Sequence, residues 1–169
     1  MRRFLVLLAT ALILWTVLAQ ANHALSDLHV FLFTPALFVV YAALMLPLPA
    51  GLATSFAGGL LCDATSPVAF GTHALLFAAA HAVVFHLRDG LPREDTVGRV
   101  VIALLANLGL FLAFSFLQIA RSPAPAAVWP RVLADLACSQ VALTIVAPWY
   151  FALQSRALVL AGADRAPLR

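Results

Sequence analysis

The residues best placed for chemistry lie around Asp63, an acid that follows a long uncharged stretch. Residues 50–62 carry no charge, and an ionisable side chain at or near hydrocarbon depth is costly enough to mark a candidate functional site. A proton relay between Asp63 and His81 is one chemistry that these residue types allow. The structural interpretation is that Asp63 reaches the membrane–water interface and caps the turn after it. The sequence alone leaves both interpretations open.

The other reactive residue types form no recognisable catalytic or metal-binding pattern. Cys62 and Cys138 lie in or beside apolar runs without Cys-x-x-Cys or Cys/His spacing. His73 and His81 are too far apart in sequence to form a familiar ligand set with Asp63. There is no glycine-rich phosphate loop and no carboxylate pair for acid–base catalysis. We therefore expect a protein without metal, cofactor or enzymatic activity.

Composition places the chain in the membrane class. Of its 169 residues, 64% are hydrophobic and 10% are charged, and the mean hydropathy is +1.02. A soluble domain is about half apolar and about a quarter charged. All ten basic residues are arginines that flank apolar runs, so the net charge of +3 does not indicate nucleic-acid binding. The sequence predicts one all-α membrane domain over residues 1–169.

Prolines, glycines and charges divide the chain into six apolar runs, which we expect to form a compact bundle of six transmembrane helices. A span needs about 20 residues, with a lower limit near 17. Pro35 lies inside the second run, where a membrane helix tolerates proline if neighbours cover the freed carbonyl. The third run is short and stops at Ser66-Pro67, so a re-entrant segment is the alternative there. The approximate spans are 4–21, 29–46, 50–66, 71–86, 97–120 and 132–153.

The distribution of arginine decides between six spans and five. With six spans, eight of the ten arginines lie on the cytoplasmic side, and only Arg121 and Arg131 lie outside. A re-entrant third run would reverse most of them, against the positive-inside rule. The small-x-small pattern Ala19-Gln20-Ala21 resembles a signal-peptide cleavage site, but the apolar run before it is longer than in signal peptides. We therefore predict an uncleaved multi-pass protein of the cytoplasmic (inner) membrane with both termini in the cytoplasm.

Small residues mark two helices for close packing. Gly58 and Gly59 lie in the third run, and Ala74, Ala78 and Ala82 recur every four residues in the fourth. In lipid, small residues at this spacing let helices approach closely. They predict either a partner-binding face or packing inside the bundle.

Polar residues in the apolar runs predict contacts between side chains. Arg131 and Asp135 are four residues apart and are expected to pair. Asp63 has no basic neighbour at helical spacing, so Arg121 from another segment is its expected partner. Hydrogen bonds between helices are expected from four further polar residues: Asn107, Gln118, Gln140 and Thr144.

The stretch from Gly59 to Leu75 resembles the MreD family of bacterial rod-shape-determining membrane proteins. Members are small, have about six spans with cytoplasmic termini, and carry a glycine followed four residues later by aspartate. A proline or small-residue turn, a glycine and an alanine-leucine pair then open their next helix. The matching residues here are Gly59, Asp63, Pro67, Gly71, Ala74 and Leu75.

The resemblance implies a non-enzymatic inner-membrane component of the peptidoglycan elongation complex that determines cell shape. Such a protein binds the membrane helix of MreC and links MreB filaments with the synthase formed by RodA and a transpeptidase. Asp63 and the turn after it would shape the outer end of a groove for that helix. The sequence leaves open whether the protein also forms a homodimer.

The alternative is the substrate-binding S-component of an energy-coupling-factor vitamin transporter. These proteins are also six-helix bundles of similar length, and MreD proteins resemble them in fold. An S-component would bind its vitamin in an outward-facing pocket, to which Asp63 and Trp129 could contribute. The alanine-x-x-x-alanine pair that many S-components carry in their first helix is absent, because Ala9, Ala11 and Ala19 lack an alanine four residues on. This absence favours the MreD resemblance.

Overall fold

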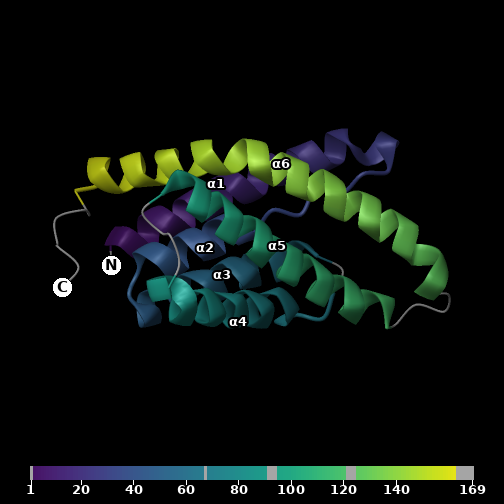
Figure 1. Ribbon diagram of the computed structural model, residues 1–169, viewed down its shortest axis with the longest axis horizontal. Helices are drawn as coiled ribbons and strands as arrows, with labels where there is room; N and C mark the ends of the chain where they lie inside the picture. Colours follow the sequence, from purple (N-terminus) through teal and green to yellow (C-terminus); the bar gives the residue numbers. More distant parts are fainter. Residues whose placement is uncertain (1, 67, 91–94, 121–124, 163–169) are drawn as a thin grey trace.

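The computed structural model describes residues 2–66, 68–90, 95–120 and 125–162, and this part of the chain contains helices but no strand. Two single-turn helices, η1 (Ser26–Leu28) and η2 (Arg88–Gly90), follow α1 and α4. The long elements are shown in Figure 1: α1 (Arg2–Ala24), α2 (Ala36–Met45), α3 (Leu48–Thr65), α4 (Thr72–Leu87), α5 (Thr96–Ile119) and α6 (Pro125–Leu160).

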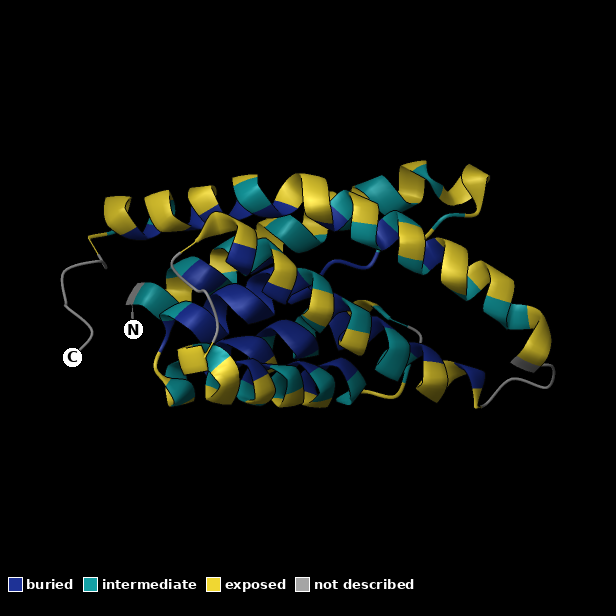
Figure 2. Ribbon diagram, viewed as in Figure 1, coloured by how far each residue is buried: buried dark blue, intermediate teal, exposed yellow. Residues whose placement is uncertain are grey.

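The short helix α2 lies at the centre, and the other five surround it in the order α1, α3, α4, α5 and α6. Every side chain from Ala36 to Leu44 is buried, as expected for a helix that is apolar all round. Figure 2 shows the buried residues gathered on α2 and on the inward faces of its neighbours. The outward faces carry exposed apolar residues such as Ile13, Leu105 and Ile145.

Among the residues that the structure describes, three helices are long and apolar enough to cross a membrane: α1, α5 and α6. The longest, α6, has 36 residues with Pro130 and Pro148 inside it, and at 1.5 Å per residue it extends over about 54 Å. The sequence predicted a helix only from 132 to 153 here. The additional turns at both ends explain why α6 runs along most of the molecule in Figure 1.

The second apolar run is not one helix, which differs from the expectation for residues 29–46. Residues 30–34 are non-helical, and α2 begins only after Pro35, its N-cap residue. Pro35 therefore does not interrupt a helix. It precedes one, at a position where its missing N–H and fixed φ are tolerated.

Side chains from two other helices form hydrogen bonds with the backbone of residues 30–34, called the extended segment below. Asn22 of α1 donates a hydrogen bond from Nδ2 to the carbonyl oxygen of Leu32 at 3.0 Å. Buried backbone amides need such partners, and three N–H donors of the segment find them in α1 and α6: Phe31 at Asp135 Oδ1 (2.9 Å), Leu32 at Asn22 Oδ1 (2.7 Å) and Phe33 at Ser139 Oγ (2.9 Å).

The predicted side-chain contacts are only partly formed. The prediction that Arg131 pairs with Asp135 is wrong, because the carboxylate of Asp135 instead accepts the hydrogen bond from the extended segment. Gln140 does hydrogen-bond between helices, from Nε2 to the Leu104 carbonyl of α5 at 3.1 Å. Thr144 donates to a carbonyl of its own helix. Asn107 is buried, and neither of its amide atoms has a partner among the described residues.

Candidate functional site

Asp63 lies at the end of α3 and caps the start of α4. Its side chain is buried, with 4% of the residue exposed. Oδ2 accepts hydrogen bonds from the backbone N–H of Gly71 (3.0 Å) and Ala74 (3.2 Å). Oδ1 accepts one from the backbone N–H of His73 (2.9 Å) and one from His73 Nδ1 (2.8 Å). The carboxylate therefore satisfies N–H groups that a helix start leaves without partners.

The cap comes from a neighbouring helix because α4 has no capping side chain of its own. Its N-cap residue is Gly71, with φ +95°, a left-handed conformation that glycine adopts readily and other residues rarely. The chain can turn sharply there and direct its first amides at Asp63. The end of α3 at Thr65, followed by the extended Ser66, matches the predicted stop; Pro67 lies outside the described residues.

Gly59 brings α3 and α4 into contact one turn before Asp63. A Cβ atom at Gly59 would overlap the backbone of Ala74 and His73, so only glycine fits at this crossing. Gly58 faces the other way, where a Cβ would meet the ring of Phe38 in α2. The two glycines thus pack against two different helices, and the predicted close approach of a second backbone is confirmed at Gly59.

His73 is a side-chain partner of Asp63; Arg121, the partner expected from the sequence, lies outside the described residues. The imidazole is tilted against the ring of Phe114 with centroids 4.6 Å apart and meets Phe77 edge-on at 5.8 Å. Because Nδ1 donates to Asp63, the neutral ring carries its proton on Nδ1 and leaves Nε2 as an acceptor. Nε2 has no hydrogen-bond partner among the described residues.

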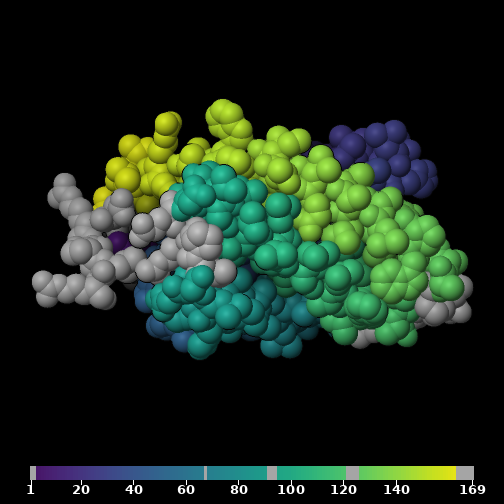
Figure 3. All heavy atoms as spheres, in the orientation of Figure 1, coloured from purple at the N-terminus to yellow at the C-terminus, as the bar shows by residue number. Residues whose placement is uncertain are grey.

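A cavity of about 500 Å³ lies beside this pair. Its walls come from α1, the extended segment, the end of α3, and α4 and α5. A second cavity of about 280 Å³ continues from it toward α6. Figure 3 shows that side chains of α4, α5 and α6 form much of the face of the molecule that is turned toward the viewer. The lining residues of the larger cavity are Trp15, Leu18, Ala19, Asn22, Phe31, Leu32, Phe33, Cys62, Thr65, Ser66, Val68, His73, Phe77, Phe114 and Gln118.

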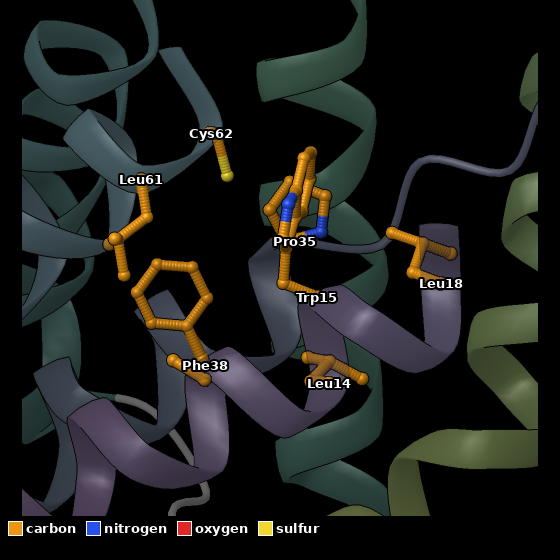
Figure 4. A pocket seen from close by; sticks show the side chains of 9 residues that line it. Leu14, Trp15, Leu18, Pro35, Phe38, Leu61 and Cys62 are labelled. Carbon is orange, nitrogen blue, oxygen red and sulfur yellow. The ribbon is translucent and has the colours of Figure 1, made fainter. Parts of the chain in front are cut away.

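A much smaller gap of about 20 Å³ lies next to the large cavity, between α1 and α3. Figure 4 shows the ring of Trp15 beside Pro35, with Phe38, Leu61 and Cys62 around the opening. Trp15 and Cys62 line both spaces. The indole therefore forms part of the wall of the large cavity toward α1.

The structure brings together four of the six motif residues. Gly59, Asp63, Gly71 and Ala74 form one contact unit between α3 and α4. Leu75 does not join them, because its side chain points outward and is 68% exposed. On the same helix Ala78 and Ala82 are half-buried.

His81 belongs to a separate place in the bundle. It is fully buried, its Nδ1 lies 3.1 Å from Ser55 Oγ, and its ring lies where a Cβ atom of Gly51 would be. It makes no hydrogen bond to Asp63, so a direct relay between the two is not formed. Among the described residues, no three His, Cys, Asp or Glu side chains are grouped to hold a metal ion.

The contact between His73 and Asp63 was not predicted from the sequence. An acid at the end of one helix, followed ten residues later by a histidine in the first turn of the next, was the available signal. No known protein family, no curated protein and no solved structure matches this chain.

Proposed function

We propose that this protein is a non-enzymatic component of the bacterial elongation complex that determines rod shape, and that it resembles MreD. The observation that supports the proposal is the contact unit of Gly59, Asp63, Gly71 and Ala74. Each motif residue has a physical task there: Gly59 permits the helix crossing, Gly71 permits the turn, and Asp63 caps α4. A motif with such a role determines how α3 and α4 are arranged, and it needs no catalytic step.

The proposed topology has six membrane crossings and cytoplasmic termini. Residues 30–34 can reach up to about 16 Å and the ten residues of α2 extend over about 15 Å, so together they can cover the thickness of a hydrocarbon core. Non-helical backbone at such a depth requires burial in protein, which the side chains of Asn22, Asp135 and Ser139 provide. Eight of ten arginines then lie on the cytoplasmic side.

In this proposal the outer end of the bundle, at the turn between α3 and α4, helps to receive the membrane helix of MreC. Leu75 supplies an exposed apolar side chain directly after the capped turn. MreC would in turn connect the protein with MreB filaments and with the RodA–transpeptidase synthase. Contact within the bilayer suits a protein whose loops are short.

The test is co-purification of the tagged protein with the MreC and MreB homologues of the same genome. We expect stoichiometric MreC on the column, lost when the membrane helix of MreC is replaced by an unrelated apolar helix. Leu75→Trp should reduce retained MreC severalfold. Its matched control is Val83→Trp, an exposed position on the same helix (58% exposed), which should retain MreC fully.

Failure of the wild-type protein to retain MreC in this experiment would overturn the proposal. Equal retention by Leu75→Trp and wild type would remove the α3–α4 end from the docking surface. Asp63 is unsuited to this test because it is buried and its loss acts first on α4.

A second candidate function has one observation in its favour. The large cavity resembles in size the space that a small ligand occupies, since binding pockets usually hold about 300 to 1,000 Å³. A substrate-binding S-component of a vitamin transporter would need such a pocket. Thermal stabilisation of the protein by a vitamin, without retention of MreC on the column, would favour this alternative.

A further inference from the structure

The cavity beside His73 has features that helix docking does not use. Binding of a small molecule here would be a role beyond the proposed docking, and neither role depends on the other.

Aromatic rings form much of the cavity wall. Trp15 comes from α1, Phe31 and Phe33 from the extended segment, and Phe77 and Phe114 from α4 and α5. Phe33 and Phe114 are nearly parallel, with an interplanar angle of 15° and centroids 5.9 Å apart. Aromatic walls of this kind favour flat rings, through stacked and edge-to-face contacts.

The wall is held in place by hydrogen bonds from side chains of α1, α3 and α6. The backbone of the extended segment is hydrogen-bonded to Asn22, Asp135 and Ser139, and the start of α4 is held by Asp63. The space is therefore pre-formed in the protein, as in most small-molecule sites.

One ring nitrogen of His73 remains for a ligand in this cavity. His73 is 4% exposed and lines the cavity, and its Nδ1 edge is occupied by Asp63. The edge with Nε2 remains for the cavity, and as an acceptor it pairs with a donor.

The charges that the structure describes around the cavity favour an uncharged ligand over an anionic one. The lining residues that the structure describes include no arginine, while the carboxylate of Asp63 lies directly behind His73. A buried ion without an opposite charge is strongly disfavoured.

We propose that this cavity binds an uncharged, flat-ring molecule whose hydroxyl or N–H group donates a hydrogen bond to His73 Nε2. The rings of the wall hold the flat part, and Nε2 selects the donor. Asp63 is a positioning residue, because it fixes the orientation and the proton of the imidazole without touching the ligand.

The experiment uses Cys62, which lines the cavity and is buried. In a Cys138→Ala background it is the single thiol of the chain, so its reaction with N-ethylmaleimide in detergent reports access to the cavity. The probes are 2-naphthol and 2-methoxynaphthalene, which share the ring system and differ in the O–H donor. At about pH 8 we expect 2-naphthol to protect Cys62 at an about five- to tenfold lower concentration than 2-methoxynaphthalene.

Two variants locate the effect. His73→Phe keeps a ring but removes the acceptor, so the preference for 2-naphthol should disappear. Ala19→Trp places a large ring at the rim, since Ala19 is exposed and also lines the cavity, and it should abolish protection by both probes. Ala9→Trp, at an exposed position elsewhere on α1, is the control and should leave protection unchanged.

Three results would overturn the inference. Equal protection by the two naphthalenes would show an unselective apolar space, and equal protection by 1-octanol would show a space for chains. A Cys62 that reacts and is protected by neither naphthalene would show a cavity closed to molecules of this size. The Ala19→Trp arm and the wild-type probe pair remain decisive even if His73→Phe fails to fold. Because none of these readouts involves MreC, the docking proposal is tested separately.

Discussion

The two ends of the bundle are built differently from the same kinds of residue. At one end, Gly51 accommodates the ring of His81, and every side chain of α2 from Ala36 to Leu44 is buried. At the other end, Asp63 and His73 stand beside about 500 Å³ of open space. Both ends contain a buried histidine with a hydrogen-bond partner from α3. Only the one at the cavity keeps a ring nitrogen facing open space.

The difference follows from how the backbone is satisfied. Where α2 is helical its amides bond within the helix, and the neighbouring helices can close tightly on its side chains. Where the chain is extended, amides must be met by Asn22, Asp135 and Ser139, which holds α1 and α6 at a fixed distance. The hydrogen bonds of these polar side chains therefore keep open a space that apolar side chains would otherwise fill.

The largest expected effect comes from closing the glycine crossing. Gly59→Ala should lower the free energy of unfolding by about 3 kcal/mol, because its Cβ would overlap the backbone of Ala74. Equilibrium unfolding in mixed micelles, followed by loss of helical circular dichroism, measures this. Gly109→Ala is the control: nothing lies within 4 Å of its Cβ position, so it should cause no loss. Similar stabilities for the two variants would contradict the crossing.

The next effect comes from the cap. Asp63→Asn should cost about 2 kcal/mol in the same unfolding assay, because an amide cannot accept all four hydrogen bonds and turns a donor toward other donors. Asp27→Asn, on the exposed η1 turn, should change stability by less than about 0.5 kcal/mol. A harmless Asp63→Asn would mean that the carboxylate does not hold the start of α4.

A smaller effect is expected from the extended segment. Ser139→Ala leaves the buried N–H of Phe33 without its acceptor and should cost about 1 kcal/mol. It should also speed hydrogen exchange at Phe33, which mass spectrometry of the corresponding peptide detects. Thr144→Ala on the same helix removes a bond to its own backbone only and should leave exchange in residues 30–34 unchanged.

The smallest effect sharpens the comparison most directly. Leu18→Phe adds volume beside the large cavity and should change the free energy of unfolding by less than about 0.5 kcal/mol. The same replacement at Leu37, which is fully buried in α2, should cost about 2 kcal/mol through overpacking. Equal costs at the two positions would mean that the two ends are packed alike.

Local features of the fold were predictable from the sequence. The stop at Ser66, the turn at Gly71 and the close contact at Gly59 follow from the conformational limits of proline and glycine. The alternative of Asp63 as a cap was also visible, since a carboxylate suits a helix start.

The extended segment and the partner of Asp63 were not predictable in the same way. Residues 29–46 are almost continuously apolar, with Pro35 as the sign of a helix start, and the side chains that hold residues 30–34 include Asp135 and Ser139, more than 100 positions away. His73 was missed because we sought a charged partner at helical spacing, while the contact runs across a turn. Cavities depend on the three-dimensional fit of many side chains, which one-dimensional patterns do not contain.

The extended segment also constrains the order of events during synthesis. Residues 30–34 leave the ribosome long before Asp135 and Ser139 exist, so two of the amide groups in the first quarter of the chain wait for acceptors from the last helix. A nascent chain arrested before residue 135 should therefore keep this segment open to protease. The amides of Phe31 and Phe33 thus gain their hydrogen-bond acceptors only when α6 has been made.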